Sequence, residues 1–167
     1  MPTYEDPVRL RVLKALTDAL EEISVANGYR HDLAGAVLRG RLMFGSGDPL
    51  PMLSILEVPL PEEQIAASAG NPTLYGKWGL IVQGWADDDH KNPTDPAHFL
   101  MADVKQRLAV AKKLERGDSL LGMGDTVTNL EIGVGVVRPP DELSDKAYFW
   151  LGLMLTIVER ADKPYGA

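Results

Sequence analysis

The sequence contains one cluster of side chains that could bind a metal ion, Asp87-Asp88-Asp89-His90. Carboxylates and an imidazole at the end of a strand are ligands for divalent ions, and Glu57 could join them from a neighbouring strand. Hydrolytic enzymes use such sites to activate water. Consecutive residues of an extended chain point in alternating directions, so three adjacent aspartates converge only in a dedicated loop. We therefore expect a solvated acidic turn here and no metal site.

No other set of residues predicts catalysis. His31 lies in a polar turn and His98 near the start of a helix, and the spacing gives neither of them a serine and an orienting acid. The glycine-rich segments 45–47 and 121–124 lack the spacing of phosphate-binding loops, so we expect flexible turns there. The sequence predicts a protein that is not an enzyme, with no catalytic residue, no metal ligand and no cofactor.

The composition is that of one ordinary globular domain. The chain has 167 residues, of which 45% are hydrophobic and 25% charged, so it can bury a core without disulfides or structural metal ions. It has no cysteine, which excludes disulfides, thiolate catalysis and cysteine-built zinc sites. The N-terminus lacks a basic-then-apolar signal pattern, and both sequon-like triplets contain proline, so we expect an intracellular protein without N-glycans.

The chain is acidic, with a net charge of −7 at pH 7 and no long block of lysine or arginine. Clusters of Lys and Arg are what neutralise phosphates, so this surface is expected to repel nucleic acid on average. A local basic patch could form around Arg30, His31, Arg39 and Arg41. The simpler interpretation of these residues is a pair of solvated strand ends.

Two amphipathic helices are predicted from apolar residues at helical spacing. The first covers residues 6–26, with Asp6-Pro7 as its N-terminal cap and first turn and Asn27-Gly28 as its end. The second begins at Asp95-Pro96 and ends at Gly117. Their expected buried stripes are Val12, Leu13, Leu16, Ala19, Leu20 and Ile23 in the first helix and Ala97, Leu100, Met101, Val104, Leu108 and Ala111 in the second.

Strands are expected between the two helices and after the second one. Within the segment 76–86, the run Leu80-Ile81-Val82 is continuously apolar, which predicts a strand buried on both faces. The connections 61–77 and 117–129 are long, and we expect both to be mobile loops. The other predicted strands are 35–41, 52–60, 130–137 and 146–159.

The last predicted strand, residues 146–159, is the longest apolar run of the chain. It is too short for a membrane-spanning helix, which needs about 20 residues, so no membrane partner is expected. Aromatic and β-branched residues favour a strand, although periodicity does not distinguish it from a buried helix. At about 3.3 Å per residue, such a strand would be longer than a small domain needs. We therefore expect part of it to pair with another subunit.

These elements predict a single α+β domain over residues 1–167. The sheet is expected to be mixed and mainly antiparallel, with the two helices packed on one face. The three tryptophans, Trp78, Trp85 and Trp150, fit either the core or an interface, since tryptophan is favoured in both. Trp85 adjoins the acidic turn, and Trp150 lies on the last strand. The candidate interface residues are Trp85, Asp87, Asp88, Asp89, His90 and Trp150.

The order of elements and several local phrases resemble the tail terminator, or tail completion, proteins of long-tailed bacteriophages. The likeness extends from the N-terminal helix to Glu159 and so covers most of the chain. The phrases that carry it are Asn27-Gly28-Tyr29, Gly40-Arg41, Trp78 leading to Gly84-Trp85-Ala86, Asn92-Pro93-Thr94-Asp95-Pro96-Ala97, and Leu130-Glu131-Ile132-Gly133 running to Arg138-Pro139-Pro140.

The resemblance implies a structural virion protein with an α/β fold, six copies of which form a ring at the head-proximal end of the tail tube. Such a ring ends tube polymerisation and offers a docking face for the neck of the head. The implied partners are further copies of the chain, the tail tube protein and a head-closure or connector protein, with DNA only as passing cargo. The implied location is the virion tail and neck, after assembly in the host cytoplasm.

Two alternatives stay open on the sequence. Another neck component, such as a head-closure or connector protein, would share the composition and the need for rings. A metal-dependent hydrolase would use the turn Asp87-Asp88-Asp89-His90. A terminator would bind the end of the tube, whereas a head-closure protein would bind the portal or adaptor ring.

Overall fold

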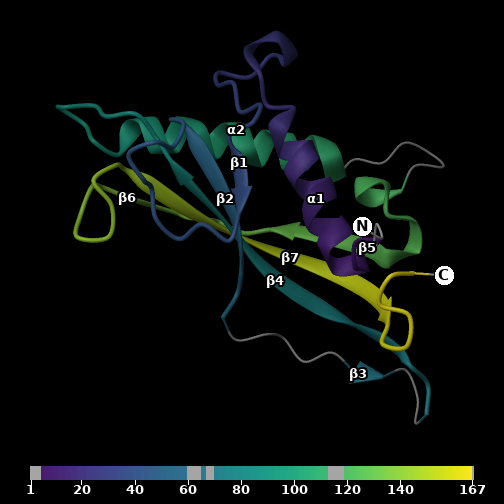
Figure 1. Ribbon diagram of the computed structural model, residues 1–167. Helices are drawn as coiled ribbons and strands as arrows, with labels where there is room; N and C mark the ends of the chain where they lie inside the picture. Colours follow the sequence, from purple (N-terminus) through teal and green to yellow (C-terminus); the bar gives the residue numbers. More distant parts are fainter. Residues whose placement is uncertain (1–4, 60–64, 67–69, 113–118, 167) are drawn as a thin grey trace.

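The computed structural model describes residues 5–59, 65–66, 70–112 and 119–166. Within these residues the chain forms two α-helices and a seven-stranded mixed sheet, with both helices on one face (Figure 1). The helices are α1 (Val8–Glu21) and α2 (Asp95–Lys112), and short 3-10 turns are η1 (Val25–Asn27), η2 (Leu120–Gly122) and η3 (Gly124–Thr126). The strands are β1 (Val37–Arg39), β2 (Met52–Glu57), β3 (Ile65–Ala66), β4 (Thr73–Trp85), β5 (Val127–Ile132), β6 (Val136–Arg138) and β7 (Tyr148–Arg160).

The sheet is built around β4 and β7, the two longest strands. They pair antiparallel over 13 residues each, from Thr73 opposite Arg160 to Trp85 opposite Tyr148. β2 pairs antiparallel with β4, and β1 continues the sheet as the parallel neighbour of β2. β5 and β6 pair with the other edge of β7, and β3 pairs with the first part of β4. The predicted α+β class, with a mixed and mainly antiparallel sheet, is confirmed.

The final apolar run forms strand β7, as its residue types indicated. We expected part of this strand to pair with another subunit, but its edges are occupied within the chain. β4 covers one edge along the whole strand. β5 and β6 cover the other edge, from Leu153 to Ile157 and from Tyr148 to Trp150. The length of β7 therefore serves the sheet of this chain and leaves no long free edge for exchange.

Helix α1 is shorter than predicted and begins differently. Pro7 occupies its N-cap position without a side-chain cap, whereas Asp6, the predicted cap, instead bonds to Lys14, with 2.6 Å between Oδ2 and Nζ. The helix ends at Glu21, and η1 follows as a separate turn that Gly28 closes with a left-handed φ of 92°. The buried residues of α1 are Val12, Leu16, Thr17 and Leu20.

Helix α2 begins at Asp95 as predicted, and residues 113–116 of the expected helix lie outside the described residues. One charged residue, Asp103, lies on its buried side. Its Oδ2 accepts the backbone N–H groups of Arg30 at 3.0 Å and His31 at 3.1 Å, and lies 2.7 Å from Nδ1 of His31. A buried carboxylate is stable only with such partners, so these bonds attach the segment before β1 to the helix.

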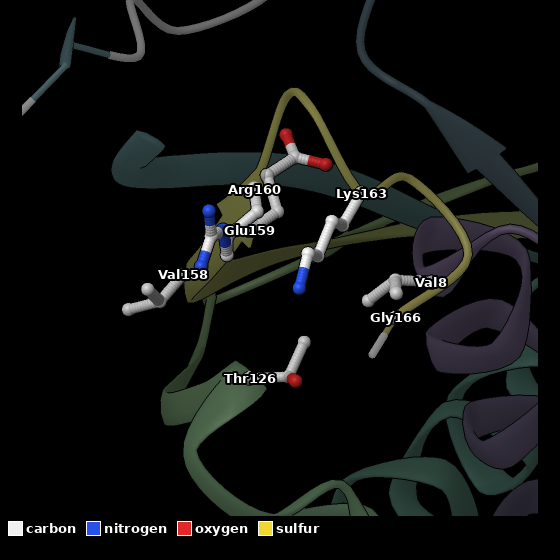
Figure 2. Close-up of a pocket in the computed structure, with 7 residues that line it drawn as sticks. All are labelled: Val8, Thr126, Val158, Glu159, Arg160, Lys163 and Gly166. Carbon is white, nitrogen blue, oxygen red and sulfur yellow. The ribbon is translucent and has the colours of Figure 1, made fainter. Parts of the chain in front are cut away.

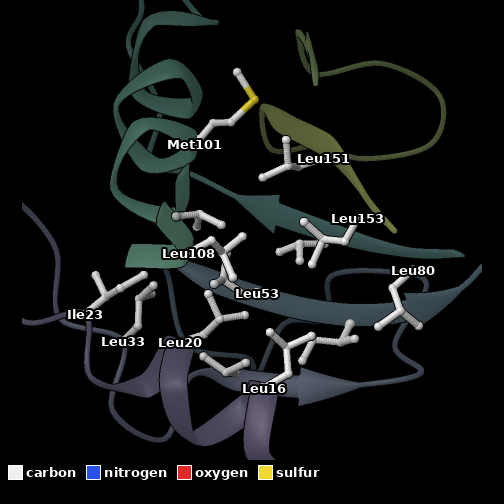
Figure 3. Packing of buried hydrophobic residues seen from close by; sticks show 14 of the residues in the cluster. Leu16, Leu20, Ile23, Leu33, Leu53, Leu80, Met101, Leu108, Leu151 and Leu153 are labelled. Carbon is white, nitrogen blue, oxygen red and sulfur yellow. The ribbon is translucent and has the colours of Figure 1, made fainter. Parts of the chain in front are cut away.

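The two helices bury one face of the sheet in a single hydrophobic core (Figure 3). Side chains alternate between the faces of a strand, so every second residue of the central strands enters this core. Complete burial of one such leucine stabilises the fold by about 1.5–3 kcal/mol. The sheet residues that contribute include Leu53 and Ile55 of β2, Leu80 and Val82 of β4, and Phe149, Leu151, Leu153 and Leu155 of β7.

Both segments predicted as mobile loops contain regular structure where they are described. In the segment 61–77, β3 pairs with β4, and β4 itself begins at Thr73. In the segment 117–129, the side chains of Leu120 and Val127 are buried as part of the core. Residues 61–64, 67–69 and 117–118 lie outside the described residues.

The predicted strand 130–137 is in fact two strands. β5 ends at Ile132, and β6 begins at Val136 after a bend that contains Gly133 and Gly135. Gly135 has a φ of 82°, a conformation that glycine adopts without strain. The bend lets the two short strands cover different parts of the same edge of β7.

Gly84 and Gly152 lie on the two central strands and provide a matched test of how the two faces are packed. A β-carbon on Gly84 would lie 2.2 Å from Cε1 of Phe149 in the helix-covered core, whereas one on Gly152 would meet nothing within 4 Å on the opposite face. We expect Gly84→Ala to lower the free energy of unfolding by about 1–3 kcal/mol through overpacking, and Gly152→Ala to leave it equal or higher. Urea unfolding measures both values, and equal losses would contradict this difference between the faces.

Candidate functional site

The acidic turn after β4 is a solvated turn, as expected from its sequence. Asp87 and Asp88 are exposed, and Oδ2 of Asp88 lies 3.4 Å from Nζ of Lys146. Oδ1 of Asp89 accepts the backbone N–H groups of the second and third residues after it, at 2.9 and 2.7 Å, and so closes the turn. The side chains are thus used separately. Across the described part of the chain, no group of three or more His, Asp or Glu residues could hold a metal ion.

Glu57 does not join this turn. In the pairing of β2 with β4, Glu57 lies opposite Leu80 at one end of β2. Trp85, which precedes the acidic turn, lies opposite Met52 at the other end. Its Oε1 accepts the indole N–H of Trp78 at 3.1 Å, and the guanidinium of Arg9 lies 4.8 Å from the centre of the same indole. Glu57 therefore fixes a tryptophan and has no part in the metal site considered from the sequence.

The two tryptophans named as interface candidates have different environments. Trp85 is fully buried in a second small cluster with Met52 and Tyr148, which Phe44 and Leu50 cover. It is therefore not a surface residue, in contrast to its predicted role. Trp150 is 37% exposed and packs edge-on against Tyr148, with 5.4 Å between the ring centres. Trp150 remains a candidate for binding another molecule.

The four basic residues around the start of the sheet do not form a common patch. The guanidinium of Arg30 lies over the ring of Phe99, 4.1 Å from its centre. Arg39 donates to the hydroxyl of Thr17 at 2.8 Å, and Arg41 is paired with Asp48. His31 contacts Asp103, as described above. Each side chain has a separate structural partner, which agrees with the simpler interpretation of these residues.

On the face of the sheet opposite the helices, Met52, Trp85 and Tyr148 are buried, whereas Trp150 and Gly152 are exposed, so within the described residues this face is covered only in part. It is hollowed beside Trp150, with a volume of about 430 Å³. The exposed fractions are 71% for Leu42, 67% for Met43 and 62% for Leu143, which are high values for large apolar side chains. We call this surface the open face; its hollow is lined by Leu42, Met43, Leu56, Ile81, Gln83, Glu142, Leu143 and Trp150.

A second hollow of about 330 Å³ continues the open face along β4 and β7, and the two hollows share Ile81. Gly152 lies in its floor and Met154 in its wall. Gly79 lines the hollow too but is covered by Val58, whose Cγ2 would be 2.8 Å from a β-carbon on Gly79. A β-carbon on Gly152 would enter empty space. Glycine in the middle of a strand often marks a place where another chain approaches closely. The open face is therefore a groove with an apolar wall and a backbone floor.

The sequence of β4 carries a signal for this groove. The run Leu80-Ile81-Val82 predicted a strand buried on both faces. Leu80 and Val82 are buried under the helices, but Ile81 points to the open face and is only half-buried. The composition of β4 is thus that of a strand covered on both sides, whereas in the described part of the chain the helices cover one side and Ile81 stays half-buried on the other.

A short turn before β7, residues 141–144, lies at the edge of the open face. Oδ1 of Asp141 accepts the backbone N–H of Leu143 at 2.8 Å and that of Ser144 at 3.3 Å. Oδ2 accepts the phenol of Tyr148 at 2.9 Å. The bond from Leu143 is the main reason that the pKa of Asp141 is below its usual value. Burial, followed by the bond to Asp141, raises the pKa of the Tyr148 phenol.

A further hollow lies beside the C-terminal segment, where Lys163 and Thr126 point into it (Figure 2). Its other charged residues are engaged locally. Arg160 bonds to Asp162, with 2.8 Å between Nη2 and Oδ2, and Glu159 is paired with Arg9 at 3.0 Å. Arg160 and Glu159 thus have partners close to the hollow within this chain. The hollow is also less apolar than the open face, since Glu159, Arg160 and Lys163 line it.

Comparison with models of known protein families gives no match, and comparison with curated protein sequences gives none either. Within the described residues, neither α-helix combines the length and hydropathy that crossing a membrane requires. The open face is therefore the feature of this chain from which a function can be argued.

The lowered pKa of Asp141 predicts how the rim of the open face responds to acid. A carboxyl whose pKa is depressed by folding stabilises the fold above its unfolded pKa of about 3.9, and this contribution is lost as the pH falls through the lower folded pKa. We expect Asp141→Asn to unfold at a lower urea concentration than the unsubstituted chain at pH 7, and the difference to narrow at pH 3. A difference that stays constant between the two pH values would contradict this role of the carboxylate.

Proposed function

We propose that the chain is a structural virion protein that assembles into a ring at the head-proximal end of a phage tail tube. In this position it ends tube polymerisation and offers a docking face for the neck of the head. The observation that carries the proposal is the open face, an apolar groove on one side of a sheet whose other side packs against the two helices. The resemblance in local phrases supports the tail terminator as the kind of assembly protein.

The chemistry of the open face favours binding over catalysis. Its lining consists mainly of aliphatic and aromatic side chains, and Gln83 and Glu142 are the polar members of the hollow beside Trp150. Contiguous exposed apolar surface of this kind marks contacts between proteins. Tryptophan is also one of the residue types that dominate binding energy at the centres of interfaces. A permanent assembly would therefore complete the second side of the sheet.

The charge of the chain is compatible with a conduit for DNA. Each copy carries a net charge of −7 at pH 7, so a ring of copies would present a negative potential. If part of this charge faces the channel, DNA that passes through it is repelled and does not stick. DNA is then cargo and not a bound partner.

Tube assembly in vitro tests the proposed function. Tail tube protein from the same phage is polymerised with and without the chain, and tube lengths are measured by electron microscopy. We expect the chain to shorten the tubes and to label one end of each tube. The matched variants are Gly152→Val, which fills the groove floor and should lose this effect, and Gly152→Ala, which leaves most of the groove open and should retain it.

Two results would contradict the terminator role. One is a set of tubes whose lengths do not change in the presence of folded chain. The other is binding to a portal or adaptor ring in place of the tube end, which would identify a head-closure or connector protein.

A further inference from the structure

The outer side of α2 carries no exposed charged residue from residue 98 to residue 110, all of which are described. Its exposed residues are His98, Phe99, Ala102, Gln106, Ala109 and Val110. The charged residues of this stretch are bonded within the fold. Asp103 is buried, and Lys105 and Arg107 donate to backbone carbonyls of the β5–β6 connection and of α1, each at 2.6 Å. The charges of α2 are thus directed away from its outer side.

Helix α1 shows the contrast. Its exposed positions include Arg11, Lys14 and Asp18, which is the pattern of a helix with one solvated face. α2 is instead apolar toward the sheet, and its outer side combines Phe99, Val110 and alanines with the polar His98 and Gln106 and has no exposed Asp, Glu, Lys or Arg from residue 98 to residue 110. A helix that is apolar on two opposite sides is one that lies between two layers. Among the described residues, only the inner layer is present.

The spacing of the outer residues of α2 fits a packed contact. Phe99, Ala102, Gln106 and Ala109 are separated by three, four and three positions, so they form one seam along the helix. The alanines allow another backbone to approach closely. Phe99 and Val110 are about half exposed and project at the two ends of the seam.

We infer that the outer side of α2 in one copy docks into the open face of the next copy. The inference rests on the proposed function, because it names the contact that would build the ring. The two apolar surfaces lie on opposite layers of the fold, one on the helix layer and one on the sheet (Figure 1). A head-to-tail contact covers both surfaces in every copy, and contacts of this kind generate rings when the rotation closes. A two-fold dimer would cover only one of them.

Residues of opposite charge adjoin the two surfaces, although the open face also has the exposed Arg138 at its edge. The exposed guanidinium of Arg30 lies over Phe99, beside the seam on α2. Glu142 and Glu131, both exposed, stand at the hollows of the open face. Opposite charges around an apolar centre steer two surfaces together and fix their orientation. The shapes agree as well, because a helical ridge with small residues would meet a groove with the exposed Gly152 in its floor.

Cysteine cross-linking tests this contact, and the absence of native cysteines gives a clean background. Two single variants are made, Ala102→Cys on α2 and Leu143→Cys at the open face, one of them with a tag that changes its mass. A short bis-maleimide linker is added to each variant alone and to their mixture. Asp18→Cys, on the charged outer side of α1, serves as the control in place of Ala102→Cys.

We expect a cross-linked product in the mixture of Ala102→Cys with Leu143→Cys, and none in either variant alone or with the Asp18→Cys control. A product of Ala102→Cys with itself would overturn the inference, because it would show that the same side of α2 meets in a two-fold contact. Absence of any product in the mixture, under conditions in which the unsubstituted chain is oligomeric or bound at tube ends, would overturn it too.

A variant of the groove separates this inference from the proposed function. Gly152→Val, introduced into both cysteine proteins, should preserve the fold, because a β-carbon at Gly152 meets nothing, and should abolish the cross-linked product. Thermal unfolding followed by circular dichroism confirms that the variant is folded.

The contact and the function can fail separately. If the cysteine proteins with Gly152 retained cap tubes but give no cross-linked product, the contact is rejected and the function is retained. The cross-link without tube capping would retain the contact and reject the function.

Discussion

The pairing of β4 with β7 is the interaction on which the rest of the structure depends. Thirteen residue pairs fix the register of the two strands, and a shift by one residue would turn every apolar side chain to the other face. With this register, Leu80 and Leu153 lie opposite each other under the helices. Ile81 and Gly152 lie opposite each other on the open face. One ladder of hydrogen bonds thus determines both the core and the groove.

The two layers of the fold leave the chain with an apolar surface on each side. The helix layer buries one face of the sheet, but α2 shows a second apolar side to solvent. The sheet layer shows the open face with Trp150 and the glycine floor. Isolated apolar residues on a surface need no explanation, whereas contiguous apolar surfaces mark sites where another molecule binds. The proposed ring accounts for both surfaces with one kind of contact.

Local patterns in the sequence predict the helices and strands, but they do not predict which of their side chains are covered by distant parts of the chain. The spacing of Leu16 and Leu20 predicted the buried side of α1, and the residue types of the last segment predicted β7. Trp85 and Trp150 could not be distinguished, because both lie on the same face of the sheet. Trp85 is buried only because a loop that is distant in the sequence covers it, and no local pattern contains that information. Within the candidate site, the groove depends on the register in which β4 pairs with β7, and the periodicity of the sequence does not predict that register.

The most direct test of the account is acrylamide quenching of tryptophan fluorescence over a rising concentration of the chain. Trp78 and Trp85 are buried, so Trp150 on the open face is the tryptophan that acrylamide can reach. The account predicts that quenching decreases as the chain assembles, because a neighbouring copy covers the open face. Quenching that is the same at all concentrations would show that the open face stays in contact with water, and would contradict the central claim that assembly occurs through it.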